Sequence, residues 1–383
     1  MRTLGFCGDW LVTSCGTKLV AVHTKEDREA FVFDCSLAEK RPKQTKGDDT
    51  SDGAEETGND EVLAFAASAS GRLLALTDDT KRLVLFGCEP SWTCISTRWV
   101  VRRCTALTFS QAEDELLVAD KSGDVYSFSV AAAQRDGELK LGHLSMLLAV
   151  VISPDDRFII TADRDEKIRV SHRRSPYNIQ AFCLGTLVML VGVLIPVPCF
   201  CQDGTVKLWE FESGRQLQSW ELQEDGSTDS APETAVLLGS VCRDSGRHLF
   251  RLDSDGGSGL GPPRVLPLPR SPLDVSFDRD GRLWVLMDSC EDPVQVFYSA
   301  PVRTGSGLGP VSGFTAALFS VPASRSFQHL FKVSYDNVTS YLQKKQQRLE
   351  EQLKRRAAQE ENGGKKSRRE ESGPEHRTDP DSV

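Results

Sequence analysis

The sequence has few of the features that mark an enzyme or a metalloprotein. Its 383 residues include six histidines, whose spacing suggests no metal site. Walker, GxSxG and HExxH motifs are missing, and no Rossmann fingerprint joins a strand to a helix. The eleven cysteines form no CxxC pair, which is typical of core thiols in a reducing compartment. We therefore expect a protein without catalytic residues and without a metal or cofactor of its own.

Two further absences concern partners and location. The formal net charge is −9 at pH 7, so the chain lacks the excess of positive charge expected of a general nucleic-acid binder. The N-terminal stretch has Asp9 within its short apolar run and is not a convincing signal peptide. We therefore expect a protein of the nucleus or the cytosol.

What the sequence does contain is a regular order of strands and turns, best seen in Gly142–Ser171. Met146–Ile152, Phe158–Thr161 and Lys167–Ser171 have the apolar and β-branched composition of strands. A Ser-Pro-Asp-Asp turn separates the first two, and an acidic turn separates the last two. Three antiparallel strands in about 30 residues match one propeller blade without its outer strand.

The same order recurs along the chain. Strand, polar turn, strand, acidic turn and strand follow one another in Leu63–Phe86, Cys104–Ser129 and Leu273–Phe297. A further copy ends at Trp209, which stands at the Trp position of the WD signature. The period and the signature together predict an all-β fold, a WD-repeat β-propeller of seven blades formed by residues 1–334.

Two segments depart from this pattern. Residues 39–61 have many charges and one apolar side chain, so we predict a disordered acidic insertion between blades. Residues 182–270 contain an altered fifth repeat and then a Gly- and Pro-rich stretch in which the repeat fades. We expect irregular fifth and sixth blades there.

The chain has one long apolar run, Phe182–Cys201, which contains no charged residue. Its length and hydropathy make it a candidate transmembrane segment. Pro196 and Pro198 lie in its last third, however, and blades on either side of it could not close a ring across a bilayer. We favour a buried, altered pair of strands without membrane insertion, and a spanning segment remains the alternative.

Gly142 and His143 stand where WD repeats carry a Gly-His pair. A histidine at this position usually binds a threonine and a turn aspartate of its own blade, and Thr161 and Asp165 are suitably placed. We therefore predict a structural role for His143.

The C-terminal part changes to a helical period. An amphipathic helix is predicted over residues 335–360, with a disordered tail over 361–383. From Tyr335 to Arg369 the chain has ten Lys and Arg against five acidic residues. This segment is either a solvated helix or a basic arm that contacts phosphates. The cations that we assign to RNA binding are Lys344, Lys345, Arg348, Lys354 and Arg355.

Several blocks of sequence are more specific than the WD pattern. They are STRWVVRRCTALTF (Ser96–Phe109), LLVADKSGDVYSFSV (Leu116–Val130), GHLSMLL (Gly142–Leu148), SPDDRFIITADRDEKIRVS (Ser153–Ser171) and YDNVTSYLQKK (Tyr335–Lys345). These blocks resemble the WD-repeat non-catalytic subunit of the tRNA guanine-N7 methyltransferase.

The resemblance implies a heterodimer that processes tRNA. In that family a separate Rossmann-fold methyltransferase binds S-adenosylmethionine and forms N7-methylguanosine in the variable loop of tRNA. The propeller scaffolds this catalytic subunit, and the tRNA lies across both chains. The implied location is the nucleus, with the cytoplasm as a second location; the basic run Lys365–Arg369 is a weak motif for nuclear import.

The resemblance also assigns the contact with the catalytic subunit to charged residues of blades three and four. In this sequence they are Lys121, Asp165, Glu166, Lys167 and Arg169. Alternating charges on a propeller face can pair with opposite charges and so select one partner. From the residues alone, a simpler interpretation is that Asp165 shapes its turn and Arg169 is an ordinary surface residue of a strand. A general WD-repeat scaffold, such as a ubiquitin-ligase substrate adaptor, is the alternative function.

Overall fold

The computed structural model of the chain divides into two units, residues 1–332 and 333–383. It describes residues 2–41, 58–165, 167–184, 188–189, 197–200, 205–221, 239–240, 248–251, 264–267, 272–287, 293–297 and Gln346. The predicted helix over 335–360 and the predicted tail over 361–383 therefore lie outside the described residues, apart from Gln346. So do residues 42–57 of the predicted insertion.

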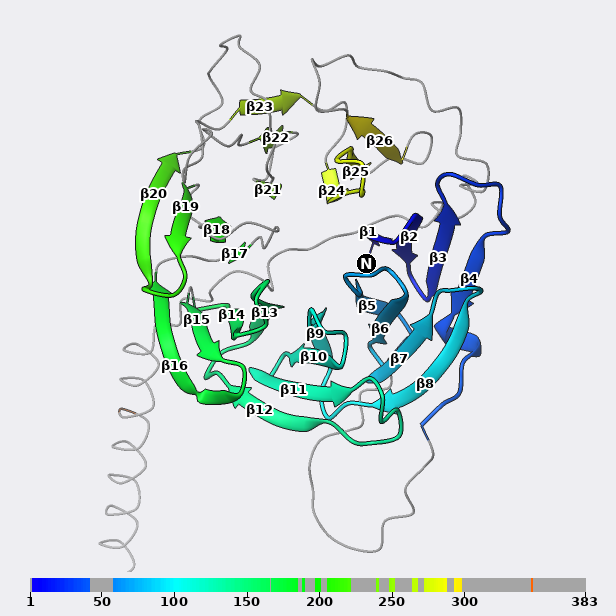
Figure 1. Cartoon of the computed structure of the whole chain (residues 1–383), viewed down its shortest axis with the longest axis horizontal. Helices are drawn as coiled ribbons and strands as arrows, with labels where there is room; N and C mark the ends of the chain where they lie inside the picture. Colours follow the sequence, from blue (N-terminus) through cyan, green and yellow to red (C-terminus); the bar gives the residue numbers. More distant parts are fainter. Residues whose placement is uncertain are drawn as a thin grey trace, which may run out of the picture. The chain divides into compact units, whose positions relative to one another are not determined.

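The described residues form seven antiparallel sheets, one after another along the chain (Figure 1). The first sheet contains β1 (Arg2–Cys7), β2 (Trp10–Cys15), β3 (Lys18–His23) and β4 (Phe31–Asp34), followed by the short 3-10 helix η1 (Cys35–Leu37). The second contains β5 (Val62–Ala67), β6 (Leu73–Asp78), β7 (Arg82–Gly87) and β8 (Thr93–Trp99). The third contains β9 (Cys104–Phe109), β10 (Glu115–Asp120), β11 (Asp124–Ser129) and β12 (Glu138–Gly142). The fourth contains β13 (Leu147–Ile152), β14 (Phe158–Asp163), β15 (Lys167–His172) and β16 (Ser175–Leu184).

The remaining sheets are shorter. The fifth contains β17 (Val188–Met189), β18 (Val197–Phe200), β19 (Thr205–Glu210) and β20 (Arg215–Glu221). The sixth contains β21 (Gly239–Ser240), β22 (His248–Arg251) and β23 (Arg264–Pro267), and the seventh contains β24 (Pro272–Phe277), β25 (Leu283–Met287) and β26 (Val294–Phe297). The last two sheets have three described strands each, so seven complete blades stay a prediction.

The first strands of neighbouring sheets contact one another. β1 contacts β5, β5 contacts β9, β9 contacts β13, and β1 also contacts β24 of the seventh sheet. The backbone N–H of Leu4 donates to Asp274 at 2.8 Å, and the rings of Phe6 and Trp284 meet edge to face at 5.5 Å. The first and last sheets are thus side by side, as the blades of a propeller are. The prediction of an all-β propeller is confirmed.

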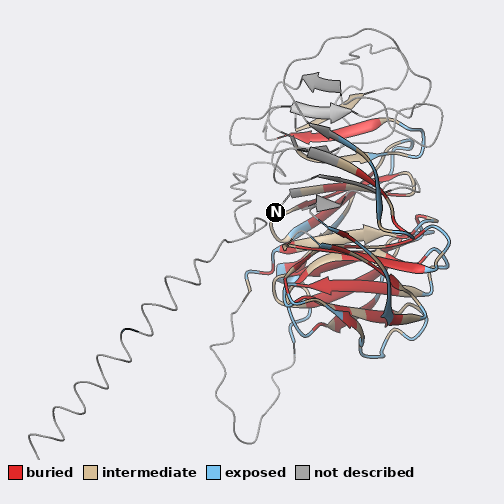
Figure 2. Ribbon diagram, turned by 90° about the vertical axis from the view of Figure 1, so that its left-hand side faces the viewer, coloured by how far each residue is buried: buried red, intermediate tan, exposed pale blue. Residues whose placement is uncertain are grey.

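The core lies between the sheets, where the buried strands stack on one another (Figure 2). Leu76 of β6 and Val84 of β7 pack into a cluster with the first sheet, whereas Ala75 and Leu85 pack into a cluster with the third. Both faces of these strands are therefore buried, which explains why β7 is an apolar run rather than a clean alternation. Burial of each large aliphatic side chain stabilises the fold by about 1.5–3 kcal/mol.

The turns between the first and second strands of four sheets share one geometry. In the fourth sheet, the N–H of Asp156 donates to the carbonyl of Ser153 at 2.9 Å, and Asp156 has a φ of 59°. Residues with the same positive φ occupy the equivalent turns of the other sheets: Gly71 in the second, Glu113 in the third and Gly281 in the seventh. Two of these four positions therefore carry a side chain in a backbone region that favours glycine.

Those two side chains bind the turn of the preceding sheet. The carboxylate of Asp156 accepts the N–H groups of Gln111 and Ala112 at 2.9 and 3.0 Å. The carboxylate of Glu113 accepts both the N–H and the hydroxyl of Ser70. The strained backbone thus carries an acceptor that joins two blades, which a glycine could not supply.

Near the end of the predicted insertion, Asp60 is buried and belongs to the fold. Arg82 is 1% exposed and binds Asp60 at 3.0 Å and Asp78 at 2.9 Å. A guanidinium can remain in the core at this position because it pairs with two carboxylates and donates a hydrogen bond to the carbonyl of Cys35 at 2.7 Å. The last residues of the predicted insertion therefore belong to the fold.

The apolar run Phe182–Cys201 begins in β16, the outer strand of the fourth sheet. Phe182 and Leu184 are 44% and 58% exposed, whereas Cys183 between them is buried. The prediction of burial is wrong for these two residues, because successive side chains of an outer strand point to opposite faces. Residues 185–187, 190–196 and Cys201 lie outside the described residues. No helix in the described part of the chain is long and apolar enough to cross a membrane.

Candidate protein-interaction surface on the third and fourth sheets

Aspartates at the ends of β10 and β14 fix the turns that carry the predicted partner-binding residues. Asp163 accepts the N–H groups of Asp165 and Lys167 at 2.9 and 3.2 Å. Asp120 accepts the N–H groups of Ser122 and Asp124 at 2.8 and 3.1 Å. Each turn is bound to the end of its own strand, so the side chains on it are displayed in a fixed arrangement.

His143 connects these two turns. Its Nδ1 lies 2.9 Å from a carboxylate oxygen of Asp163, and its Nε2 lies 2.8 Å from the hydroxyl of Thr161. Its backbone N–H donates to the carbonyl of Gly123, in the turn of the third sheet, at 2.7 Å. The structural role of His143 and its contact with Thr161 are confirmed. The prediction that Asp165 is its partner is wrong, because Asp163 ends the strand and Asp165 contributes its backbone N–H instead.

The surroundings of Asp163 favour its charged form. Burial raises the pKa of this carboxyl. The hydrogen bonds from His143 and from the N–H of Lys167 lower the pKa by more than burial raises it, so the net pKa lies below the ordinary value.

Gly123 lies where the two turns come together. Its φ is 101°, and a Cβ at this position would lie 2.5 Å from the carbonyl oxygen of His143. A side chain at position 123 would therefore push the two turns apart.

Arg169 crosses from the fourth sheet to the third. It lies in β15, and its Nη1 donates to the carbonyl of Gly142, the last residue of β12, at 3.0 Å. Burial lowers its pKa, and the charge of Asp163 partly opposes this effect. Its buried Nε has no hydrogen-bond partner among the described residues. The guanidinium is partly removed from water, yet Arg169 as a whole stays partly exposed, so a carboxylate could still pair with it.

The structure brings four of the five predicted partner-binding residues to one end of the third and fourth sheets. Lys121 and Lys167 are exposed, and Asp165 and Arg169 are partly buried. We call the surface formed by Lys121, Asp165, Lys167 and Arg169 the charged end. Glu166 lies outside the described residues, as do Lys344, Lys345, Arg348, Lys354 and Arg355. The roles assigned to these residues stay predictions.

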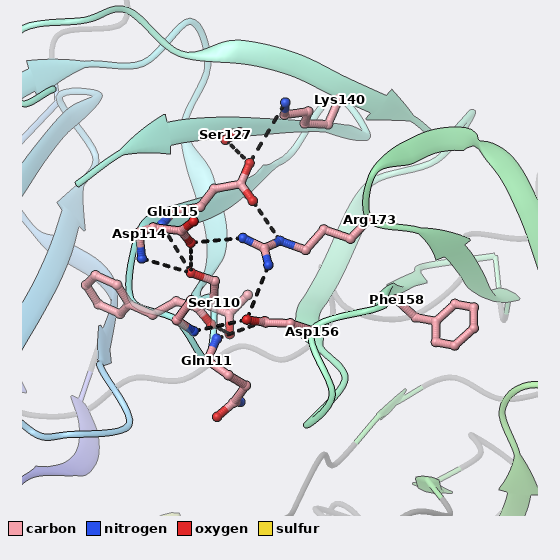
Figure 3. Close-up of polar contacts among 12 residues, drawn as sticks. Ser110, Gln111, Asp114, Glu115, Ser127, Lys140, Asp156, Phe158 and Arg173 are labelled. Carbon is pink, nitrogen blue, oxygen red and sulfur yellow. Dashed lines mark hydrogen bonds and ion pairs between the residues drawn. The ribbon is translucent and has the colours of Figure 1, made fainter. Parts of the chain in front are cut away.

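A second charged cluster lies at the opposite end of the same strands (Figure 3). Arg173, after β15, binds Glu115 at 2.9 Å, Asp114 at 3.0 Å and Asp156 at 3.2 Å. Lys140 of β12 also approaches Glu115, at 3.9 Å. The cluster borders a hollow of about 790 Å³, but its central cation is already paired with three carboxylates. It therefore acts as an ionic clasp between the third and fourth sheets.

Sequence reasoning missed this clasp and the exposed apolar residues beside the charged end. No sequence pattern pairs Arg173 with Glu115 and Asp114 of the preceding blade, because these two residues lie 58 and 59 positions away from it. Leu144 is fully exposed, although it stands between the buried side chains of His143 and Ser145. No three metal-binding side chains gather anywhere in the part of the chain that the structure describes.

The sheet order, the repeated turn aspartates and the His143 network define a WD-repeat β-propeller with a rigid charged end. A chain in the "Crystal Structure of Mitotic Checkpoint Complex" has the same kind of fold, with a TM-score of 0.58 and 14% identity over 77% of this chain and 87% of that chain. The family model described as "tRNA methyltransferase TRM82 WD40 domain" matches residues 17–139 and 131–241. The chain belongs to this family.

Relatives with high identity cover most of the chain. The "tRNA (guanine-N(7)-)-methyltransferase non-catalytic subunit wdr4" of Danio rerio is 50% identical over 88% of this chain and 90% of its own length. The corresponding subunit of Homo sapiens is 41% identical over 89% of each chain. The family resemblance found in the sequence is therefore confirmed.

Proposed function

We propose that this chain is the non-catalytic subunit of a tRNA guanine-N7 methyltransferase and binds the catalytic subunit through the charged end. Membership in the family and the names of the relatives support the accessory role. The contact between Arg169 and Gly142 supports the location, because it holds a partly exposed cation across two blades. Such a side chain loses little freedom on binding, so more of the contact energy remains as affinity.

The chain performs no chemistry in this proposal. A Rossmann-fold catalytic subunit holds S-adenosylmethionine and methylates the guanosine in the variable loop. The propeller keeps enzyme and tRNA in one arrangement, which reduces the entropy lost in reaching a reactive geometry. Lys344, Lys345, Arg348, Lys354 and Arg355 contribute phosphate contacts that hold the tRNA without reading its bases.

The first experiment measures binding of the purified chain to its catalytic subunit. Arg169→Leu is expected to weaken the heterodimer by at least about tenfold, because loss of one partner in a desolvated charge pair leaves the other unpaired. Arg174→Leu is the matched control, since Arg174 is exposed at the opposite end of the same sheet. Equal binding by wild type and Arg169→Leu would exclude the charged end as the contact. Absence of any binding by the folded wild-type chain would favour a general scaffold instead.

The second experiment concerns the tRNA. Replacing Lys344, Lys345 and Arg348 with Glu should preserve the heterodimer and weaken tRNA binding. The slope of log affinity against log salt should fall by about 0.7–0.9 for each phosphate that the variant no longer neutralises. The same change at the exposed cations Arg72, Arg135 and Arg174 of the propeller is the control. An unaltered slope in the first variant would rule out this role for the basic segment.

We also place the complex in the nucleus, with the cytoplasm as a second location. The basic run Lys365–Arg369 is the feature that supports import. Deletion of this run should shift a fluorescently tagged chain from the nucleus to the cytoplasm, and an unchanged distribution would contradict its role.

A further inference from the structure

The charged end is bordered by apolar side chains that the fold leaves in water. Phe182 and Leu184 lie in β16 directly opposite Arg169 and Lys167 of β15. Residues that are directly opposite in an antiparallel pair project from the same face of the sheet. The two apolar side chains therefore stand beside the two cations.

This shared face is the one toward the third sheet. On the other face, Ile168 and Cys183 are buried in a cluster with Trp209 and Phe211 of the fifth sheet. β16 contacts β12, the outer strand of the third sheet, yet Phe182 and Leu184 remain 44% and 58% exposed. The fold therefore covers these two side chains only in part.

Leu144 approaches the same region from the connection between the two sheets. It follows Gly142, whose carbonyl binds Arg169, by two residues. It is 104% exposed, while the side chain of His143 and the residue Ser145 on either side of it are buried and His143 is held by three hydrogen bonds. A leucine with no contacts of its own is thus fixed on a rigid loop.

Single exposed apolar residues are ordinary, but two of these lie opposite the cations of β15, and the third follows by two residues the carbonyl that Arg169 binds. Protein interfaces have this composition: apolar anchors at the centre exclude water, and charged groups beside them set orientation. We propose that Leu144, Phe182 and Leu184, the apolar trio, form the water-free part of the contact with the catalytic subunit. This inference rests on the proposed function.

The occupant is accordingly an apolar patch of the catalytic subunit with a carboxylate at its edge. The carboxylate meets Arg169, and the apolar patch covers the trio. Exclusion of water by the trio strengthens the charge pair, because the interaction of two charges increases as the local dielectric constant falls. The trio adjoins the charged end, which is the proposed contact with the catalytic subunit. We therefore assign the trio to that subunit rather than to a second copy of this chain.

The test replaces all three residues with serine and measures binding to the purified catalytic subunit over a range of salt concentrations. The expected result is affinity reduced by about 100-fold, since truncation of one anchor weakens an interface by about tenfold and the effects of neighbouring anchors are not fully additive. The slope against salt should be unchanged, because no charge is removed. Arg169→Leu, by contrast, should lower the slope. The heat-capacity change of binding should become less negative in the serine variant.

The matched control replaces Val32, Leu37 and Ile95 with serine. These residues are 50%, 86% and 42% exposed and lie in β4, η1 and β8, away from the charged end. If the control variant loses as much affinity as the trio variant, the effect is not specific and the inference is wrong. Leu144→Ser alone provides a second variant in which no buried atom changes, and it should weaken binding by about tenfold.

The outcomes separate the two proposals. If the wild-type chain does not bind the catalytic subunit, the proposed function and the inference fail together. If the wild type binds and Arg169→Leu weakens binding, but the trio variant binds like the control, the inference fails and the proposed function stands. Weaker binding by the trio variant with an unchanged salt slope supports both.

Discussion

Asp156 offers a direct test of how the propeller holds its blades together. Its carboxylate accepts two N–H groups of the preceding turn, at 2.9 and 3.0 Å, and binds Arg173 at 3.2 Å. Each hydrogen bond to the carboxylate should contribute about 1 kcal/mol, because water can reach these groups in part. The ion pair adds about 0.5–1 kcal/mol, since Arg173 keeps its other carboxylates. Asp156→Ala should thus lower the free energy of unfolding by about 3 kcal/mol.

Glycine at the same position separates the contribution of the carboxylate from the backbone strain. The left-handed conformation, with a φ of 59°, disfavours a residue that has a Cβ by about 1 kcal/mol. Asp156→Gly relieves this strain and should therefore lose about 2 kcal/mol instead of 3. Asp156→Asn keeps one acceptor oxygen and tolerates the conformation, so it should lose about 1 kcal/mol. The expected order of stability is wild type, Asn, Gly and Ala.

The assay is equilibrium urea unfolding, with thermal unfolding as a second measure. Gly281→Ala calibrates the strain alone, because Gly281 has a φ of 76° and no atom lies within 4 Å of an added Cβ. That variant should lose about 1 kcal/mol. If Asp156→Gly is at least as stable as the wild type, the carboxylate contributes less than the strain it requires. The interpretation of Asp156 as a link between blades would then be wrong.

Three further predictions concern buried charge. His143→Ala leaves an oxygen of buried Asp163 without its partner and should lower the free energy of unfolding by about 2 kcal/mol, measured in urea. Arg82→Leu leaves buried Asp78 without a cation and leaves Asp60 with only Lys40, at 3.8 Å, so it should lower the free energy of unfolding by about 3–5 kcal/mol. A loss below about 1 kcal/mol would show that the ion pairs contribute little. The pKa of Asp163 is below 3.8 in the folded chain, so its contribution to stability is present above pH 3.8 and is lost as the pH falls through the folded value. The temperature of thermal unfolding, measured between pH 6 and pH 2, should fall as this contribution is lost. The fall should be smaller in the Asp163→Asn variant.

The strands were predictable because their signal is local. Alternation, β-branched residues and turn aspartates predicted β14 and β15 within two residues at each end. The contact between His143 and Thr161 was predictable for a related reason, since both belong to one repeat. Asp163 was missed in favour of Asp165, because spacing along the chain does not show which side chain points to the histidine and which contributes its backbone.

Contacts between blades could not be predicted in the same way. Asp60 and Arg82 are 22 positions apart on either side of the boundary between two repeats, and no period relates them. The positive φ of Asp156 had no sequence signal either, because glycine usually marks that conformation. In both cases the neighbouring sheet decides the conformation of the residue. A period within one repeat contains no information about that neighbour.

The two ends of the third and fourth sheets have different roles. At one end, Arg173 is saturated by three carboxylates, so this end stabilises the fold and offers little to a partner. At the other end, the His143 network fixes the backbone, while Arg169 stays partly exposed and Leu144 has an uncovered side chain. The clasp fixes the angle between the sheets, and that angle sets the spacing of the groups at the charged end. Affinity for a partner should therefore depend on residues of the clasp that the partner never touches.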